Sequence, residues 1–237
     1  MTAKRATLVF VGPTLPAAEV ERRLPGATVM PPAAVGDILR ATRRRSVARI
    51  AIIDGYFERM AAVWHKEVLV ALARGIEVWG AASMGALRAA ELAPFGMRGV
   101  GVIYRDYARG VLVSDDEVAI AHLPAEYGYQ ATSDALVNIR YGLARAQKLR
   151  LIDERSNLRL LALARSRFYR ERTWSLLMDD ARAAKLDVEQ LAPWPKPDQK
   201  ASDARLLLQT LRASPRQRPT KLAVPRTWAL RQLERLL

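Results

Sequence analysis

Short apolar runs rich in β-branched residues recur through the first half of the chain, and helix-like segments separate them. The runs cover residues 6–11, 47–53, 76–80 and 99–103. Runs of this kind, closed by turn residues, are typical of strands buried on both faces of a parallel sheet. Helical patterns occupy residues 36–45, 64–74 and 84–92. The alternation predicts an α/β fold with a largely parallel sheet flanked by helices.

Strand patterns end at about residue 132, and aliphatic stripes at helical spacing take their place. The helices expected there cover residues 133–148, 154–172, 173–185, 201–213 and 225–237. A Pro-rich segment at 193–197 interrupts them, because proline cannot continue a helix. We therefore expect an α/β core domain at residues 1–147 and a C-terminal helical appendage, basic in charge, at residues 148–237.

Composition excludes several classes of function. The chain has no cysteine, which rules out disulfides and thiolate metal sites, and two histidines are too few for a zinc site built from protein ligands. No Gly-rich loop ends in the Gly-Lys-Ser/Thr that binds phosphates. The apolar runs are far shorter than the roughly 18–20 residues that cross a bilayer. We expect no metal, no cofactor, no membrane segment and a cytoplasmic location.

The formal net charge of +14 raises the question of nucleic acid as a partner. Arginine is scattered among alanine and leucine, however, and aromatic residues that could stack on bases are not interleaved with it. An acidic protein partner fits the charge equally well, because complementary charge accelerates encounter and selects partners. We therefore favour protein partners over nucleic acid.

The segment WGAASMGALRAAEL at residues 79–92 places Ser83 where a predicted strand turns into a predicted helix. Small residues on both sides of the serine resemble the tight turn that presents a hydrolase nucleophile. The N–H groups of Met84 and Gly85, at the start of the helix, are candidate donors to an oxyanion. The alternative is a small-residue turn in which the serine only caps the helix.

A serine nucleophile needs a base, and two neighbouring residues offer one. His65 is a candidate, although a histidine packed against Trp64 is the simpler interpretation. Lys66 is more informative, because 31 of the 38 basic residues are arginine and only lysine can lose its proton near neutral pH. A serine–lysine pair is a known nucleophile–base arrangement. The alternative is a solvated lysine paired with Glu67 or Glu91.

Asp54 follows the predicted strand at residues 47–53 and precedes Gly55. A carboxylate there could orient a base or a nearby backbone segment, or the Asp-Gly pair could simply form a turn. Ligands of parallel sheets bind at the carboxyl ends of the strands. Asp54, Ser83 and Tyr104 are all expected at that edge.

Several ordered blocks across residues 6–145 resemble the TfuA-like family. These blocks are residues 10–15 (FVGPTL), 30–37 (MPPAAVGD), 53–58 (IDGYFE), 63–67 (VWHKE), 80–92 (GAASMGALRAAEL), 96–97 (GM), 115–119 (DDEVA) and 138–140 (NIR). No family pattern is evident after about residue 148.

The resemblance implies a function that residue patterns alone do not give. TfuA-like proteins accompany YcaO enzymes in peptide-backbone thioamidation, and they are understood to release sulfide from a thiocarboxylated, ThiS-like sulfur-carrier protein. The implied site is a serine–lysine hydrolase site with Ser83 and Lys66 in these roles, supported by Asp54, His65 and Glu91. The precursor peptide would be reached through the YcaO partner. A non-catalytic adaptor that recruits peptide or carrier to YcaO is the alternative, and an unrelated small-molecule hydrolase is a third.

Overall fold

The computed structural model describes residues 6–57, 60–191, 193–194, 196–215 and 223–237. The chain divides into two compact units. The first comprises Met1–Val113 together with Ala201–Leu237, and the second comprises Ser114–Lys200. The predicted boundary after residue 147 therefore differs from the division seen in the structure.

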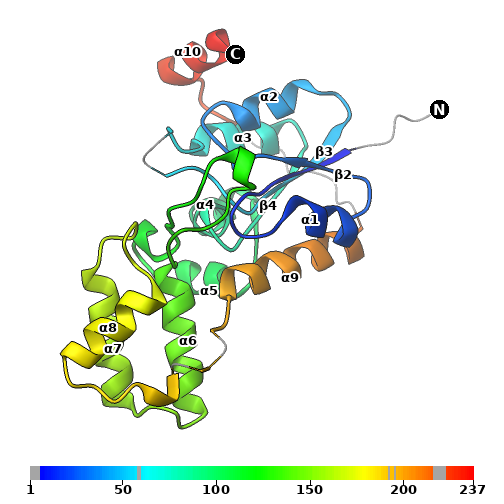
Figure 1. The fold of residues 1–237 in the computed structure, drawn as a ribbon. Helices are drawn as coiled ribbons and strands as arrows, with labels where there is room; N and C mark the ends of the chain where they lie inside the picture. Colours follow the sequence, from blue (N-terminus) through cyan, green and yellow to red (C-terminus); the bar gives the residue numbers. More distant parts are fainter. Residues whose placement is uncertain (1–5, 58–59, 192, 195, 216–222) are drawn as a thin grey trace. The chain divides into compact units, whose positions relative to one another are not determined.

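The first unit is built on a five-stranded sheet in which every pairing is parallel (Figure 1). Its strands are β1 (Ala6–Phe10), β2 (Ala27–Met30), β3 (Val47–Ile52), β4 (Glu77–Ala81) and β5 (Arg98–Val100). Their order is β2-β1-β3-β4-β5. The predicted α/β fold with a parallel sheet is confirmed. β2 was not predicted, and the last predicted strand ends at residue 103, whereas in the structure β5 ends at Val100 and α5 begins at Val102.

The helices of this unit are α1 (Ala17–Arg23), α2 (Asp37–Arg43), α3 (His65–Ala73), α4 (Met84–Leu92), α5 (Val102–Ala108), α9 (Gln199–Ala213) and α10 (Trp228–Leu236), with a short 3-10 helix η1 (Ala93–Phe95). Helices cover both faces of the sheet, whereas α10 packs against α2 and α3, where its Leu230 lies with Leu39 and Val70. Alternate strand residues point to opposite faces. One face packs Phe10 and Ile52 against α2, α3 and α4, and the other packs Val9 and Ile53 against α1 and α9.

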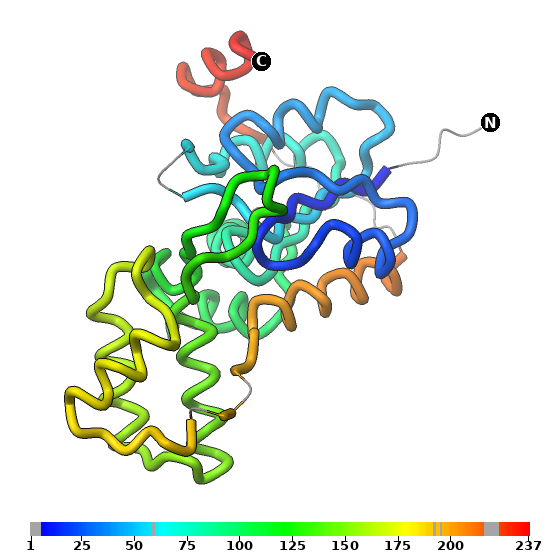
Figure 2. The backbone as a smooth tube through the Cα atoms, in the orientation of Figure 1, coloured from blue at the N-terminus to red at the C-terminus, as the bar shows by residue number. Residues whose placement is uncertain are grey.

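Helix α9 completes the core on the face of the sheet that α1 covers, although it lies far from the strands in the sequence. It is therefore part of the α/β unit and not a separate appendage. Figure 2 shows its trace running beside α1, and the buried Leu207 and Leu208 lie in the same core as the strands. The buried Arg49 of β3 donates to Glu77 at 2.6 Å, to the carbonyl of Leu211 at 2.9 Å and to that of Ser214 at 3.1 Å. These bonds fix the C-terminal end of α9 against the sheet.

The second unit is helical and has its own core. Its helices are α6 (Leu136–Lys148), α7 (Glu154–Ser166) and α8 (Trp174–Ala183), with short 3-10 helices η2 (Asp115–Glu117), η3 (Ala125–Tyr127) and η4 (Glu189–Leu191). Ile139 and Leu143 of α6 pack with Leu160 of α7 and Leu177 of α8. Helix α6 therefore belongs to the second unit with α7 and α8. The first unit accordingly ends at Val113 and not at the predicted residue 147. No helix in the described parts of the chain is both long and apolar enough to cross a membrane.

Candidate active site

The carboxyl ends of β1, β3 and β4 form one edge of the sheet. Phe10 of β1 pairs with Ile52 of β3, and Ile52 pairs with Gly80 of β4. Asp54 follows β3 and Ser83 follows β4, so both lie at this edge as expected. Tyr104 lies within α5, so it does not directly follow a strand. The strand order reverses between β1 and β3, and this is the position where ligands bind in open parallel sheets.

Ser83 lies in a very tight turn between β4 and α4. The N–H of Ser83 donates to the carbonyl of Ala81 at 2.8 Å, across Ala82, whose φ is +66°. A bond between residues two apart with a positive central φ is the rare, strained form of the γ-turn. Such a residue costs roughly 1–3 kcal/mol and is characteristic of functional sites. Ser83 itself is only 2% exposed.

Two glycines allow the chain to make this turn. A Cβ added at Gly80 would lie 2.0 Å from the carbonyl oxygen of Gly85, and one added at Gly85 would lie 1.7 Å from that of Ile52. Both distances are far below van der Waals contact, so neither position tolerates a side chain without backbone movement. The small residues that flank Ser83 are therefore required by close packing of α4 against β3 and β4.

The two candidate oxyanion donors differ in their surroundings. The N–H of Gly85 already donates to the carbonyl of Ile53 at 3.3 Å. The N–H of Met84 begins α4, where helical N–H groups lack partners within the helix, and it has no acceptor among the described residues. Met84 is therefore the better placed of the two donors.

Lys66 is the second residue of α3 and is half-buried. Both carboxylates considered as its ion-pair partners are engaged elsewhere. Glu67 is fully buried and accepts the backbone N–H groups of Gly36, Leu39 and Trp64. Glu91 bonds His65 at 2.8 Å and Arg88 at 2.6 Å. Among the described residues, Lys66 thus has no carboxylate partner.

No hydrogen bond joins Lys66 to Ser83 within the described part of the chain. His65, the residue before Lys66, contacts Glu91, which lies about 12 Å along α4 from Ser83 at 1.5 Å per residue. Catalytic hydrogen bonds often tighten only when the substrate is bound. A reaction that uses this pair therefore requires the Lys66 ammonium nitrogen to approach Ser83 during substrate binding.

His65 pairs with Glu91, a contact that the sequence did not predict. Its Nε2 lies 2.8 Å from Glu91, and the two side chains are 48% and 36% exposed. The simpler interpretation from the sequence was a histidine packed against Trp64. The His65–Glu91 pair lies at the end of α4 away from Ser83, so it does not contact the nucleophile candidate.

Asp54 orients a backbone segment, which was one of the alternatives considered for it. Its carboxylate is 1% exposed and accepts the N–H of Gly12 at 2.9 Å, the N–H of Thr14 at 3.0 Å and the hydroxyl of Thr14 at 2.6 Å. These bonds hold the loop after β1 in place at the switch point of the sheet. Thr14 was not identified from sequence. In the sequence, Thr14 is marked only by its place in the Gly-Pro-Thr turn that ends the first apolar run.

The described residues contain no group of three or more histidine, cysteine, aspartate or glutamate side chains that could hold a metal ion.

Comparison with known families identifies the chain. The family model described as "TfuA-like protein" matches residues 54–173, just over half of the sequence. This span contains Asp54, Lys66 and Ser83, and it continues beyond the end of α6, where the sequence showed no family pattern. Comparison with curated proteins finds no match. The matched span places the chain in the TfuA-like family.

Proposed function

We propose that this protein releases sulfide from a thiocarboxylated, ThiS-like sulfur-carrier protein and works beside a YcaO enzyme in peptide-backbone thioamidation. Membership of the TfuA-like family is consistent with a YcaO-associated role. The observation that carries the proposal is the strained turn at Ala82, which holds Ser83 between a strand and the start of a helix at the ligand-binding edge of the sheet.

The proposed reaction begins with attack of the Ser83 hydroxyl oxygen on the carbonyl carbon of the thiocarboxylate. The hydroxyl proton passes to neutral Lys66, and the tetrahedral oxyanion accepts a hydrogen bond from the N–H of Met84. Collapse of this species breaks the carbon–sulfur bond. Lys66 returns the proton to the departing sulfur, which leaves as hydrosulfide. Water then hydrolyses the ester, which regenerates Ser83 and leaves a carboxylate on the carrier.

A base of this kind must be uncharged when it accepts the proton. Lysine can meet this condition when it is desolvated, whereas arginine cannot. Lys66 is half-buried and has no carboxylate partner among the described residues. The carrier's C-terminal segment would further exclude water from this edge when it binds.

The proposal is tested by measuring sulfide release from a thiocarboxylated carrier without YcaO. Ser83→Ala and Lys66→Ala are each expected to abolish release, because one removes the nucleophile and the other its base. Ser46→Ala and Lys148→Ala are matched controls, since both residues are exposed and lie outside the segments that hold Lys66 and Ser83. Wild-type release by either site variant would remove the corresponding assignment.

A non-catalytic adaptor is the second candidate, and the lack of a Ser83–Lys66 hydrogen bond among the described residues favours it. An adaptor predicts that Ser83→Ala spares thioamidation in the complete system, with carrier, precursor peptide and YcaO enzyme present. Truncation after α6 cannot test the adaptor, because α9 completes the core of the α/β unit. Point variants are therefore the appropriate comparison.

A further inference from the structure

Seven exposed arginines surround α10 and the ends of α2 and α3, and we call them the arginine surface. They are Arg43, Arg44, Arg45, Arg74, Arg226, Arg231 and Arg235. Hydrogen bonds tie the three elements together. Arg43 donates to the carbonyl of Glu234 at 2.8 Å, and Arg74 donates to the hydroxyl of Thr42 at 2.7 Å. Both acceptors are neutral, so these bonds fix the guanidinium groups without cancelling their charge.

The charge excess of the protein is concentrated in the same unit. The first unit carries 24 of the 38 basic side chains but only 11 of the 24 acidic ones, whereas the second unit is nearly balanced. Basic residues at helix C-termini are favoured by the helix dipole. That effect accounts for Arg43 in the last turn of α2 and for the C-cap residues Arg44 and Arg74, whereas Arg45 lies beyond the helix. The excess favours association with a partner of opposite charge.

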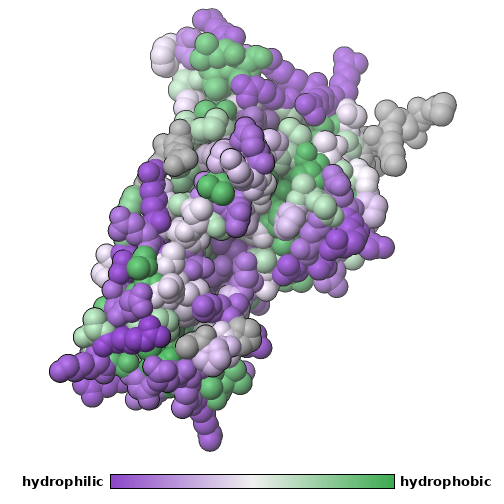
Figure 3. Space-filling view, in the orientation of Figure 1, coloured by the Kyte–Doolittle hydropathy of each residue, from purple (hydrophilic) through white to green (hydrophobic). Residues whose placement is uncertain are grey.

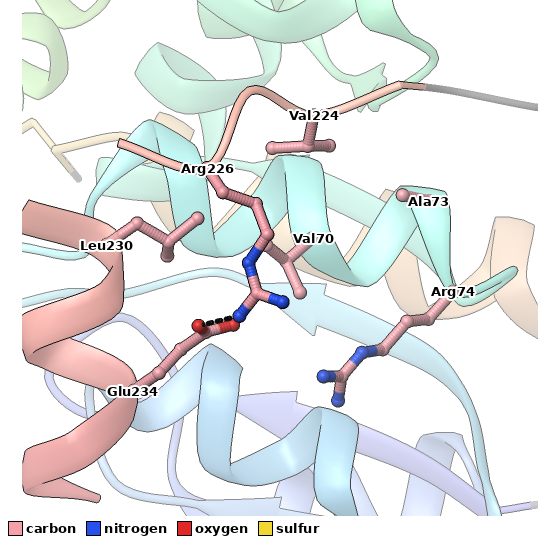
Figure 4. A pocket seen from close by; sticks show the side chains of 7 residues that line it. All are labelled: Val70, Ala73, Arg74, Val224, Arg226, Leu230 and Glu234. Atoms are coloured by element: carbon pink, nitrogen blue, oxygen red, sulfur yellow. Dashed lines mark hydrogen bonds and ion pairs between the residues drawn. The ribbon is translucent and has the colours of Figure 1, made fainter. Parts of the chain in front are cut away.

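A pocket of about 230 Å³ opens between α3 and α10, within the arginine surface (Figure 4). Its apolar lining comes from Val70, Ala73, Val224 and Leu230, and its polar lining from Arg74, Arg226 and Glu234. Figure 4 shows the Arg74 and Arg226 side chains reaching into the same space, with Arg226 paired to Glu234. An enclosed apolar cavity of about 150 Å³ accommodates benzene. This open pocket is of comparable size, so we expect it to accept one large apolar side chain against its aliphatic wall.

Apolar side chains also reach the surface next to these arginines. Trp228 and Leu236 of α10 are 70% and 82% exposed. Figure 3 shows hydrophobic residues gathered where α10 lies, at the top of a face that is otherwise largely hydrophilic. The surface thus offers apolar contact area inside a ring of positive charge.

We propose that the arginine surface binds an acidic segment of a partner protein, with one apolar side chain in the pocket and its carboxylates on the arginines. An apolar protein side chain fits the pocket better than a base, because its lining holds aliphatic side chains and no aromatic one, and the exposed Trp228 lies outside that lining. Helices α2 and α3 end at the amino edge of the sheet, opposite the edge that holds Ser83. The pocket residues Val70, Ala73 and Arg74 lie near that amino edge, and the proposal does not depend on the hydrolase function.

The test is fluorescence anisotropy of the full chain with a labelled synthetic peptide of Asp and Glu around a single Phe. Arg74→Gln is expected to weaken binding by up to about fivefold, the size of one exposed ion pair. Arg145→Gln is the matched control, because Arg145 is an exposed arginine near the C-terminal end of α6, and it should leave binding unchanged. Replacing the Phe of the peptide by Ser should weaken binding at least about tenfold.

A second variant separates the pocket from general charge attraction. Ala73→Leu adds volume inside the pocket while keeping every arginine, so it should bind the Phe and Ser peptides equally weakly. Equal binding of both peptides by the wild-type chain would overturn the proposal, as would equal losses in Arg74→Gln and Arg145→Gln. Tighter binding of a single-stranded oligonucleotide of the same charge would also overturn it, by making the surface a nucleic-acid site.

Discussion

Replacing Ala82 by glycine should leave the stability of the protein almost unchanged, although the residue is fully buried. Losing a buried methyl group costs about 0.8 kcal/mol, and the added freedom of glycine in the unfolded chain costs about 0.4–1 kcal/mol. At Ala82 these losses are offset, because glycine adopts the observed φ of +66° without the roughly 1–2 kcal/mol that alanine incurs there. The expected net change is about zero.

Ala81 provides the matched comparison, because it is also completely buried and lies in β4 without a positive φ. Ala81→Gly should lose the full amount, about 1.5 kcal/mol. Urea unfolding of both variants, followed by circular dichroism and fluorescence, measures the difference. Equal losses in the two variants would refute the claim that the turn before Ser83 is strained.

Three further predictions concern buried charged groups. Asp54→Asn should lower the free energy of unfolding by about 3–5 kcal/mol, because it disturbs three hydrogen bonds. Thr14→Val should lower it by about 1–2 kcal/mol, because it removes one of them. Urea titration of both variants measures the difference. Burial raises the pKa of Glu67 above its ordinary 4.5, so folding favours the protonated carboxyl group. The Tm of the wild type should therefore fall relative to that of Glu67→Gln as the pH rises from about 4.5. Arg49→Met should cost about 3–5 kcal/mol by thermal or urea unfolding, and adding Glu77→Leu should recover most of it.

The sequence predicted those strands whose environment is uniform. β1, β3 and β4 are largely buried, so each one is mostly apolar, and the charged residues Arg49 and Glu77 pair with each other. β2 is a short edge strand of four partly or fully exposed residues next to Pro25-Gly26 and Pro31, and it resembles a loop. The helix α5 begins within a β-branched segment because Asp203, distant in sequence, accepts the N–H of Ile103 at 2.8 Å.

The candidate site divides in the same way between local and distant determinants. The Ser83 turn was predicted because a tight turn depends on the small residues beside it, Gly80 and Gly85. The bonds of Asp54 span about 40 residues of sequence, and the His65–Glu91 contact spans 26, so no local pattern indicates them. The sequence does not predict that α9 packs on the sheet, for the same reason. Its leucine stripe predicts an amphipathic helix but does not indicate which surface that helix covers.

Single-turnover sulfide release tests the central claim most directly. With the protein in excess over a thiocarboxylated carrier, the measured rate reports the chemical step and is independent of carrier dissociation. Ser83→Ala should lower this rate at least about a thousandfold while the circular dichroism spectrum and the free energy of unfolding stay at wild-type values. A Ser83→Ala rate equal to that of wild type would contradict the account, because sulfide would then leave without the serine hydroxyl.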